Sequence, residues 1–285
     1  MFKRNFSQPI DYDYLHVIRQ YEILYISRVL PLGETKNLSI LNFGAGDGYQ
    51  SRLLEELGYS VTSLDLATSR HASHSNNNIV EYDGLNIPFA DSSFDFIFSS
   101  NVLEHVSPSL YSHIFSELSR VSKSDALHIH ILPTPRWRLY TSLTYYTALT
   151  RSLILYFVFH VSRICKKPFL DQSNNIDDDT HRSSLVKNQS KFARHSLSLL
   201  ARLRLLLPPS HGYQYNSFLE ILKYSTYAWR NVFSSNNMRL VDVRDIDTVY
   251  TGYSLFGKHI PISVRRKLSI FLGPSTRVFI LSRCH

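Results

Sequence analysis

Three glycines on a two-residue spacing, Gly44, Gly46 and Gly48, follow a short apolar run and precede a segment with helical patterning. Glycine has no Cβ and tolerates positive φ, so such a loop lets a ligand lie directly against the backbone. The start of the following helix offers unpaired N–H groups. Residues 39–57 therefore predict a strand, a glycine loop and a helix that together seat a nucleotide-type cofactor.

The residues after the glycines separate three kinds of cofactor loop. A phosphate-binding P-loop needs Lys followed by Ser or Thr directly after the last glycine, whereas this chain has Tyr49 and Gln50 there. The dinucleotide fingerprint needs a small residue at position 49. The G-x-G-x-G spacing resembles instead the first motif of class I S-adenosylmethionine (SAM)-dependent methyltransferases. Taken alone it is equally compatible with an ordinary turn, so the rest of the chain must decide.

An acidic residue stands where a cofactor crevice would need one. The alternating run Tyr59–Asp65 ends in Asp65, 17 positions after Gly48. At the carboxyl end of the second strand of a doubly wound sheet, a carboxylate can accept both hydroxyls of a ribose. The competing interpretation is a cap on a surface helix, and the glycine loop upstream favours the ribose ligand.

The resemblance becomes specific between positions 83 and 106. The chain reads Asp83-Gly84, Ile87-Pro88-Phe89, Ser93-Phe94-Asp95 and Val102-Leu-Glu-His-Val106 in that order. These segments resemble the successive motifs of the type 11 branch of class I methyltransferases. The resemblance implies SAM as cofactor and assigns residues to it by position: Asn42, Gly44, Gly46, Gly48, Asp65, Asp83, Gly84, Ser100 and Asn101.

Each of these positions has an implied role. The glycines would hold the methionine part and ribose, Asp65 the ribose hydroxyls, Asp83 the adenine amino group and Gly84 the ring edge. Ser100 and Asn101 would lie beside the methyl donor. Asn42 departs from the family, which normally has Asp or Glu there, and an amide loses the charge that faces the methionine ammonium. The Lys-Pro-Gly-Gly turn of the family is also replaced, by Ser122-Lys-Ser-Asp125.

His105 is the candidate catalytic base if the methyl acceptor is a hydroxyl, because imidazole titrates near neutrality. Glu104 would orient His105 or bind the substrate. The alternative for His105 is a packing residue at a helix start. His128 and His130 share one face of an expected strand, but a third ligand is missing, so no metal site is predicted.

The expected fold is α/β, a doubly wound and mainly parallel seven-stranded sheet with a helical insertion between the fifth and sixth strands. The leading segment 12–30 has the periodicity of a helix, and such a helix packs over the cofactor site or on the sheet. Four parts are predicted: a helical cap (1–37), the SAM-binding core (38–135), the insertion (136–235) and the closing strands (236–285).

The predicted insertion carries the whole basic excess of a chain whose net charge is +8. Residues 136–230 contain 14 basic and 5 acidic residues. The stretch 191–207 predicts a basic amphipathic helix, which lies on an anionic membrane or packs on its own core. Residues 153–159 are strongly apolar but too few to span a bilayer. Cys165 and Cys284 fit no metal or redox spacing, and no secretory signal is visible, so a cytoplasmic location is expected.

The sequence thus predicts a SAM-dependent methyltransferase that acts on a hydroxyl of a small-molecule, glycan or lipid-linked acceptor. An RNA methyltransferase is the second enzyme hypothesis, motivated by the basic segment, but no RNA-binding module supports it. A third hypothesis, of another class, is a SAM-binding protein without turnover, which Asn42 permits.

Overall fold

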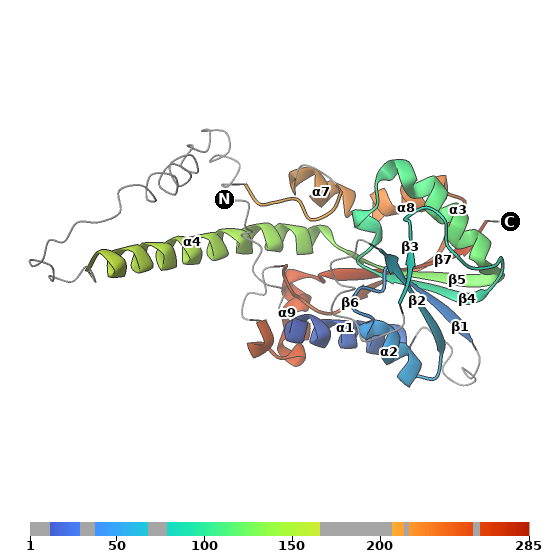
Figure 1. Ribbon diagram of the computed structural model, residues 1–285, viewed down its shortest axis with the longest axis horizontal. Helices are drawn as coiled ribbons and strands as arrows, with labels where there is room; N and C mark the ends of the chain where they lie inside the picture. Colours follow the sequence, from blue (N-terminus) through green and yellow to red (C-terminus); the bar gives the residue numbers. More distant parts are fainter. Residues whose placement is uncertain are drawn as a thin grey trace, which may run out of the picture. The chain divides into compact units, whose positions relative to one another are not determined.

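The computed structural model describes residues 12–28, 38–67, 79–165, 207–213, 217–252 and 257–284 (Figure 1). The chain forms two compact units, one of residues 10–143 and 209–285 and one of residues 1–9 and 144–208. In the second unit, the described residues 144–165 continue the helix α4 (Pro135–Cys165), which begins in the first unit.

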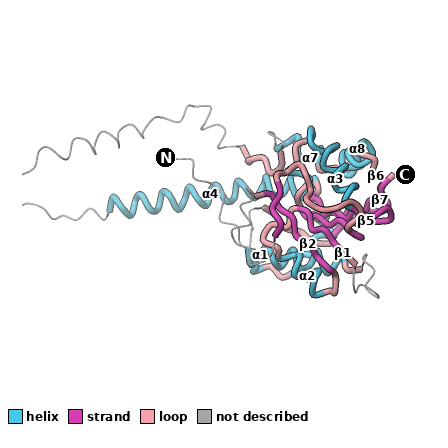
Figure 2. Tube along the Cα trace, turned by 45° about the vertical axis from the view of Figure 1, so that its right-hand side comes forward, coloured by secondary structure: helices cyan, strands magenta, loops and turns pink. Residues whose placement is uncertain are grey.

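The first unit contains one seven-stranded sheet with the order β3-β2-β1-β4-β5-β7-β6 (Figures 1 and 2). Strands β1 to β5 pair in parallel, whereas β7 runs antiparallel between β5 and β6. This arrangement confirms the predicted doubly wound, mainly parallel sheet. The strands are β1 (Ser39–Phe43), β2 (Ser60–Leu66), β3 (Ile79–Tyr82), β4 (Phe94–Ser100), β5 (Ser122–Pro133), β6 (Met238–Ile246) and β7 (Thr276–Arg283).

Helices flank both faces of the sheet (Figure 1). The other α-helices are α1 (Tyr12–Ile26), α2 (Tyr49–Glu56), α3 (Tyr111–Val121), α7 (Ser217–Lys223), α8 (Thr226–Ser235) and α9 (Ile262–Leu272). Helix α1 ends at Ile26, four residues before the end predicted from periodicity. Helices α4, α7 and α8 fall between β5 and β6 in the chain. The amphipathic helix predicted at 191–207 lies outside the described residues, apart from its last position.

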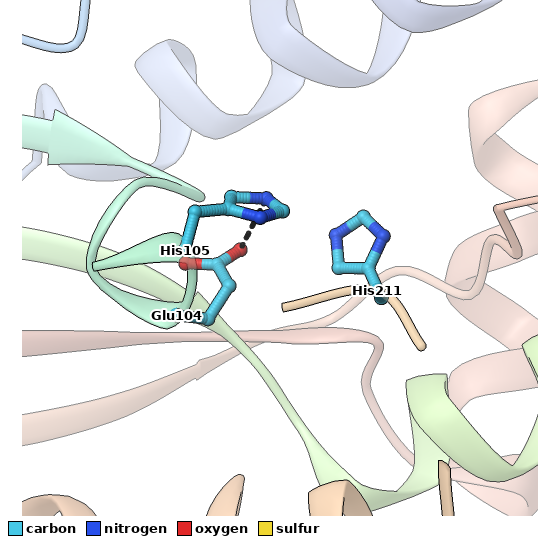
Figure 3. A group of neighbouring side chains, drawn as sticks. All are labelled: Glu104, His105 and His211. Carbon is cyan, nitrogen blue, oxygen red and sulfur yellow. Dashed lines mark ion pairs between the residues drawn. The ribbon is translucent and has the colours of Figure 1, made fainter. Parts of the chain in front are cut away.

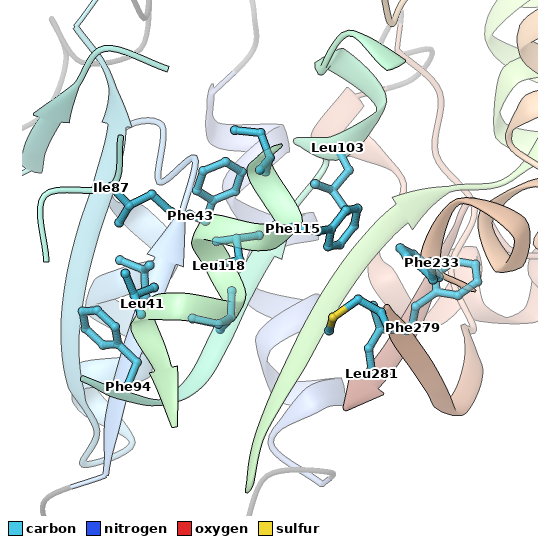
Figure 4. Packing of buried hydrophobic residues seen from close by; sticks show 14 of the residues in the cluster. Leu41, Phe43, Ile87, Phe94, Leu103, Phe115, Leu118, Phe233, Phe279 and Leu281 are labelled. Carbon is cyan, nitrogen blue, oxygen red and sulfur yellow. The ribbon is translucent and has the colours of Figure 1, made fainter. Parts of the chain in front are cut away.

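Strand β1 shows how the alternation of side chains builds two cores. Leu41 and Phe43 belong to the cluster packed with α3 and α8 (Figure 4). Ile40 belongs to the opposite cluster, with residues of α1 and α2. Because side chains of a strand alternate between the two faces, this central strand is apolar on both sides. The carboxyl ends of β1, β2 and β4 are thereby fixed at one edge of the sheet.

No helix in the described part of the chain combines the length and hydropathy needed to cross a bilayer.

Candidate functional site

The glycine loop between β1 and α2 adopts the backbone that its sequence predicts. Gly44, Gly46 and Gly48 have φ of 75°, 63° and 74°, which glycine adopts far more readily than other residues. The N–H groups of Gly44 and Ala45 donate to the Leu64 carbonyl at 2.8 and 3.0 Å. The loop is therefore held against the end of β2.

Gly44 also needs to lack a side chain for a packing reason. A Cβ at this position would lie 2.5 Å from Cγ2 of Val102, which follows β4. The loop thus touches both neighbouring strand ends, and the cofactor seat and the segment after β4 form one surface.

Asp65 lies at the end of β2, directly beside the loop. Its Oδ2 accepts the Gly46 N–H at 2.7 Å and its Oδ1 accepts the Leu66 N–H at 2.7 Å. The side chain is buried, with 9% of its residue surface exposed. Asp65 therefore shapes the glycine loop in addition to any contact with a ribose.

Asp83 and Gly84 follow β3 in a turn. Asp83 Oδ1 accepts the N–H groups of Leu85 and Asn86 at 2.7 and 2.8 Å. These hydrogen bonds, that from Asn86 first, lower the pKa of Asp83, so the carboxylate is ionised at neutral pH. Gly84 has φ of 86° and packs on Leu66 at the end of β2.

Asn42 contacts α2 through its side-chain amide. Its Nδ2 donates to Ser51 Oγ at 2.8 Å, and Ser51 Oγ lies 2.6 Å from Ser63 Oγ. Asn42 is 2% exposed. The amide that replaces the expected acid is therefore part of a buried polar chain that joins β1, α2 and β2.

Helix α1 brings two charged residues to the end of β4 that the sequence did not mark as site residues. Arg19 Nη1 donates to Glu22 Oε2 at 2.6 Å and to Ser100 Oγ at 2.9 Å. With its amide assigned from the hydrogen-bonding pattern, Asn101 Oδ1 accepts from Arg19 Nη1 at 2.5 Å. Glu22, which is fully buried, also accepts from Gln50 at 3.3 Å. The only signal in the sequence is an acid three residues after a base on a helix that is otherwise rich in apolar residues.

Glu104 and His105 lie in a short 3₁₀ turn after β4 and meet His211 (Figure 3). One ligand-type atom from each residue lies within 4.8 Å of the other two, and His105 Nε2 is 3.9 Å from Glu104 Oε1. The imidazole of His211 is tilted against that of His105, with ring centroids 4.8 Å apart. The two predicted catalytic residues are thus together, and His211 is an addition that sequence reasoning missed.

The Glu104 carboxyl is buried, with 4% of the residue exposed, and neither of its oxygens accepts a hydrogen bond from the described residues. Burial raises the pKa of Glu104 to about 8. Burial also lowers the pKa of His211 to about 3, so its imidazole is neutral at physiological pH. A carboxyl poised near neutrality beside a neutral imidazole is the kind of pair that serves proton transfer or metal binding.

A buried ion pair holds His211 in place. Arg138 Nε lies 2.6 Å from Glu220 Oε2, and both side chains are at most 1% exposed. Glu220 Oε1 accepts the N–H groups of His211 and Gly212, both at 2.9 Å. Arg138 Nη2 donates to the Pro209 carbonyl at 2.7 Å. The pair therefore fixes the segment 209–212 through its backbone.

The same segment rests directly on Glu104. The Tyr213 N–H donates to the Glu104 carbonyl at 3.0 Å. A Cβ on Gly212 would lie 2.4 Å from that carbonyl oxygen, so only glycine permits this approach.

A cavity of about 530 Å³ opens beside Glu104. Its walls are largely aromatic and apolar, and they include Tyr111, Tyr224, Tyr227 and Trp229. An apolar cavity of this kind suits a ligand with an apolar body.

His128 and His130 do not join this group. His128 Nε2 lies 3.0 Å from Ser122 Oγ and His130 Nδ1 lies 2.7 Å from Ser99 Oγ, and both imidazoles are fully buried. They behave as strand residues in the core, as expected.

The sheet order and the glycine loop beside Asp65 define a class I methyltransferase fold. Residues 41–129 match a family described as "Methyltransferase domain", in agreement with the resemblance that the motifs between positions 44 and 106 carry. The residues also fit the cofactor of that family. A left-handed glycine loop, a carboxylate at the end of β2 and an ionised Asp83 after β3 offer the contacts that ribose and adenine require.

Two curated proteins resemble this domain. The chain is 33% identical over 95 residues to a malonyl-[acyl-carrier protein] O-methyltransferase of Buchnera aphidicola, covering 32% of the chain and 38% of the relative. It is 30% identical over 101 residues to an uncharacterized methyltransferase of Mycolicibacterium gilvum, covering 33% and 39%. The match thus spans less than two fifths of either relative. A solved SAM-dependent methyltransferase of Aquifex aeolicus aligns over 93% of the chain and 91% of its own, with a TM-score of 0.47 and 12% identity.

Proposed function

We propose that this protein transfers the methyl group of SAM to a hydroxyl group of an acceptor that lies in the cavity beside Glu104. The observation that carries the proposal is the position of Glu104 and His105. They follow β4 directly, at the sheet edge that bears the glycine loop, and Glu104 lines the cavity. A Cβ on Gly44 would meet Val102 of the segment after β4, and Glu104 of the same segment lines the cavity, which supports placing the acceptor near the cofactor.

Separate residues bind the cofactor, border the methyl group and accept the proton in the proposed reaction. Bound SAM supplies a methyl group already activated by its sulfonium. The glycine loop, Asp65 and Asp83 hold the cofactor, and Ser100 and Asn101 border the space where the methyl group is presented. Holding the acceptor oxygen in line with that methyl group is catalysis by proximity and orientation. As the acceptor oxygen forms the new O–CH₃ bond, the S–CH₃ bond breaks and S-adenosylhomocysteine leaves as a neutral thioether. The acceptor O–H bond breaks at the same time, and its proton passes to His105, beside Glu104.

The cavity walls restrict the acceptor. Aromatic side chains on several sides favour an acceptor with an apolar or ring-shaped body, such as a small molecule or a lipid-linked intermediate. The Buchnera relative is named as an O-methyltransferase, which agrees with oxygen as the acceptor atom. Membrane contact through 191–207 remains a separate proposal that lipid-vesicle co-sedimentation tests.

Calorimetry with SAM and S-adenosylhomocysteine tests the cofactor half of the proposal. We expect the intact chain to bind both and Asp65→Ala to bind neither. Absence of binding in the intact chain would refute the proposal. Incubation of extracts with methyl-labelled SAM then tests transfer, which His105→Ala should reduce while leaving cofactor binding intact.

A SAM-binding protein without turnover is the second candidate, and Asn42 is the observation that favours it. The amide leaves the methionine ammonium without its usual carboxylate. Cofactor binding with no labelled product from any extract or acceptor library would favour this second function.

A further inference from the structure

Glu104 has a buried carboxyl group that lacks a hydrogen-bond donor among the described residues. Neither oxygen accepts a hydrogen bond from any described residue, although the residue is 4% exposed. A buried carboxyl group without a hydrogen-bond partner is unfavourable in either protonation state, and native proteins pair such groups or use them to bind cations. The site is therefore incomplete as it stands.

Arg19, whose charge acts on Glu104, does not complete the site. Arg19 is directed to Glu22 and Ser100, with which it forms hydrogen bonds of 2.6 and 2.9 Å. Arg138, the other buried guanidinium near this region, is paired with Glu220. The groups that do face the Glu104 carboxyl are the imidazoles of His105 and His211 (Figure 3).

Two imidazoles and one carboxylate are a donor set that divalent transition metals favour, and catalytic zinc sites use it with one position open. Around a tetrahedral Zn²⁺ with bonds of about 2.0–2.1 Å, neighbouring donor atoms are about 3.4 Å apart. Here the separation between His105 Nε2 and Glu104 Oε1 is 3.9 Å, and all three donors lie within 4.8 Å of one another. A contraction of about 1 Å, which side-chain rotation can supply, would bring them to bonding distance.

The supporting contacts also resemble those of a prepared site. His211 reaches the cluster only because the Arg138–Glu220 pair and the Glu104 carbonyl hold its segment by the backbone. These backbone contacts fix the position of His211 beside Glu104 before any ion binds.

We propose that Glu104, His105 and His211 bind one divalent transition-metal ion of the Zn²⁺ type. An open coordination position of this ion faces the cavity. The proposal adds a metal site that the sequence alone did not indicate, because His211 stands 106 positions after His105.

Its role in catalysis rests on the proposed methyl transfer. A metal ion that binds the acceptor oxygen lowers the pKa of the hydroxyl, which then loses its proton to solvent before the O–CH₃ bond forms. Glu104 and His105 then act as metal ligands, and direct proton transfer to His105 is not needed.

Metal binding is tested on the full chain without reference to activity. Chelator-treated protein is titrated with Zn²⁺ against a chromophoric competitor, and Co²⁺ is used in parallel because its visible spectrum reports coordination by imidazole. We expect one tight equivalent. Glu104→Gln and His211→Ala should each weaken it by at least about 100-fold, since loss of even an outer-shell partner weakens metal binding by about 10–100-fold. His113→Ala, which removes an imidazole on α3 bonded to the Leu85 carbonyl, is the matched control and should bind as the intact chain does.

Two further measurements keep the test decisive. His105→Ala alters a side chain that is 47% exposed, so it should fold normally and show the same loss even if Glu104→Gln does not fold. Zn²⁺ should also raise the melting temperature of the intact chain but not of His105→Ala. Failure of the intact chain to bind one tight equivalent, or unchanged affinity in His211→Ala, would overturn the proposal.

The metal site and the methyl transfer can fail separately. If Zn²⁺ binding depends on all three residues but no acceptor gives a labelled product, the metal site is supported and the proposed methyl transfer is refuted. If metal-free protein transfers the methyl group and added chelator has no effect, the proposed methyl transfer is supported and a catalytic role of the metal is refuted.

Discussion

The buried Arg138–Glu220 pair is expected to stabilise the acceptor half of the site more than any exposed ion pair of this protein. Both side chains are at most 1% exposed, and the closest charged atoms are 2.6 Å apart. In Glu220→Gln the amide oxygen can still accept the N–H groups of His211 and Gly212. The variant therefore isolates the charge, because it leaves the backbone contacts of the segment in place.

The magnitude follows from the cost of leaving Arg138 buried and uncompensated. Removing one partner of a buried ion pair typically costs about 3–5 kcal/mol. Because the carboxamide keeps two hydrogen bonds, we expect Glu220→Gln to lower the free energy of unfolding by about 3 kcal/mol. Arg138→Met in the same chain removes the stranded charge, so the double variant should lose only about 1–2 kcal/mol.

The intact chain, Glu220→Gln, Arg138→Met and the double variant form a double-mutant cycle. Urea unfolding at neutral pH, followed by circular dichroism, measures the free energy of unfolding of each of the four chains. Asp242→Asn is the control, since its partner Arg244 is 46% exposed and exposed pairs contribute about 0–1 kcal/mol. S-adenosylhomocysteine affinity should be the same in every variant, because the glycine loop does not touch this pair.

Additive losses in the cycle would refute the reasoning, since they would mean that the two charges do not interact. A loss below about 1 kcal/mol in Glu220→Gln would also refute it, because an exposed pair behaves that way.

Three other changes test the cofactor half and its surroundings. Gly44→Ala introduces a left-handed alanine and a Cβ 2.5 Å from Val102, so thermal unfolding should show a loss of about 2–4 kcal/mol, part of which Val102→Ala recovers. Hydrogen bonds from Arg120 lower the pKa of Glu117 to about 2. A carboxylate whose pKa is lower in the folded than in the unfolded state stabilises the fold at every pH above the unfolded-state pKa. Glu117→Gln should therefore lose about 1–2 kcal/mol at pH 7, and this difference should fade as the pH falls from 4.5 towards 2, as urea titrations at several pH values would show. Asn42→Asp restores the acid that the family normally has at this position, beside the buried Ser51 hydroxyl. If this acid pairs with the methionine ammonium, calorimetry should show SAM binding about tenfold tighter; unchanged affinity would refute that pairing.

The cofactor half was predictable because its determinants are close in the sequence. The strand before Gly44, the loop and Asp65 lie within 27 residues, and the two-residue alternation of strands is strong when both faces are buried. Short helices are harder to predict from the sequence. Helix α8 has ten residues and buries only Trp229 and Phe233, so its periodicity is weak, and its start depends on a single cap in which Ser225 accepts the Ala228 N–H.

The acceptor half was not predictable, since it depends on contacts between distant segments. His211 is one of 13 histidines and lies in a stretch without periodicity. Nothing local distinguishes it from the others until Glu220 binds its backbone N–H. Arg19 and Glu22 are similar, because an acid three residues after a base on a helix usually forms a solvated pair. Only the packing of α1 against the end of β4 makes that pair part of the site.

Different interactions therefore hold the cofactor half and the acceptor half in place, and we expect the two halves to unfold at different denaturant concentrations. Positive-φ glycines and strand ends fix the cofactor loop, so changes there strain the backbone of the central sheet. A buried ion pair and backbone hydrogen bonds fix His211, so loss of a single charge can loosen its segment while the sheet stays folded. Partial destabilisation should thus release the acceptor side first: under mild urea, protection of the 209–212 amides from hydrogen exchange should fall before that of β1 and β4.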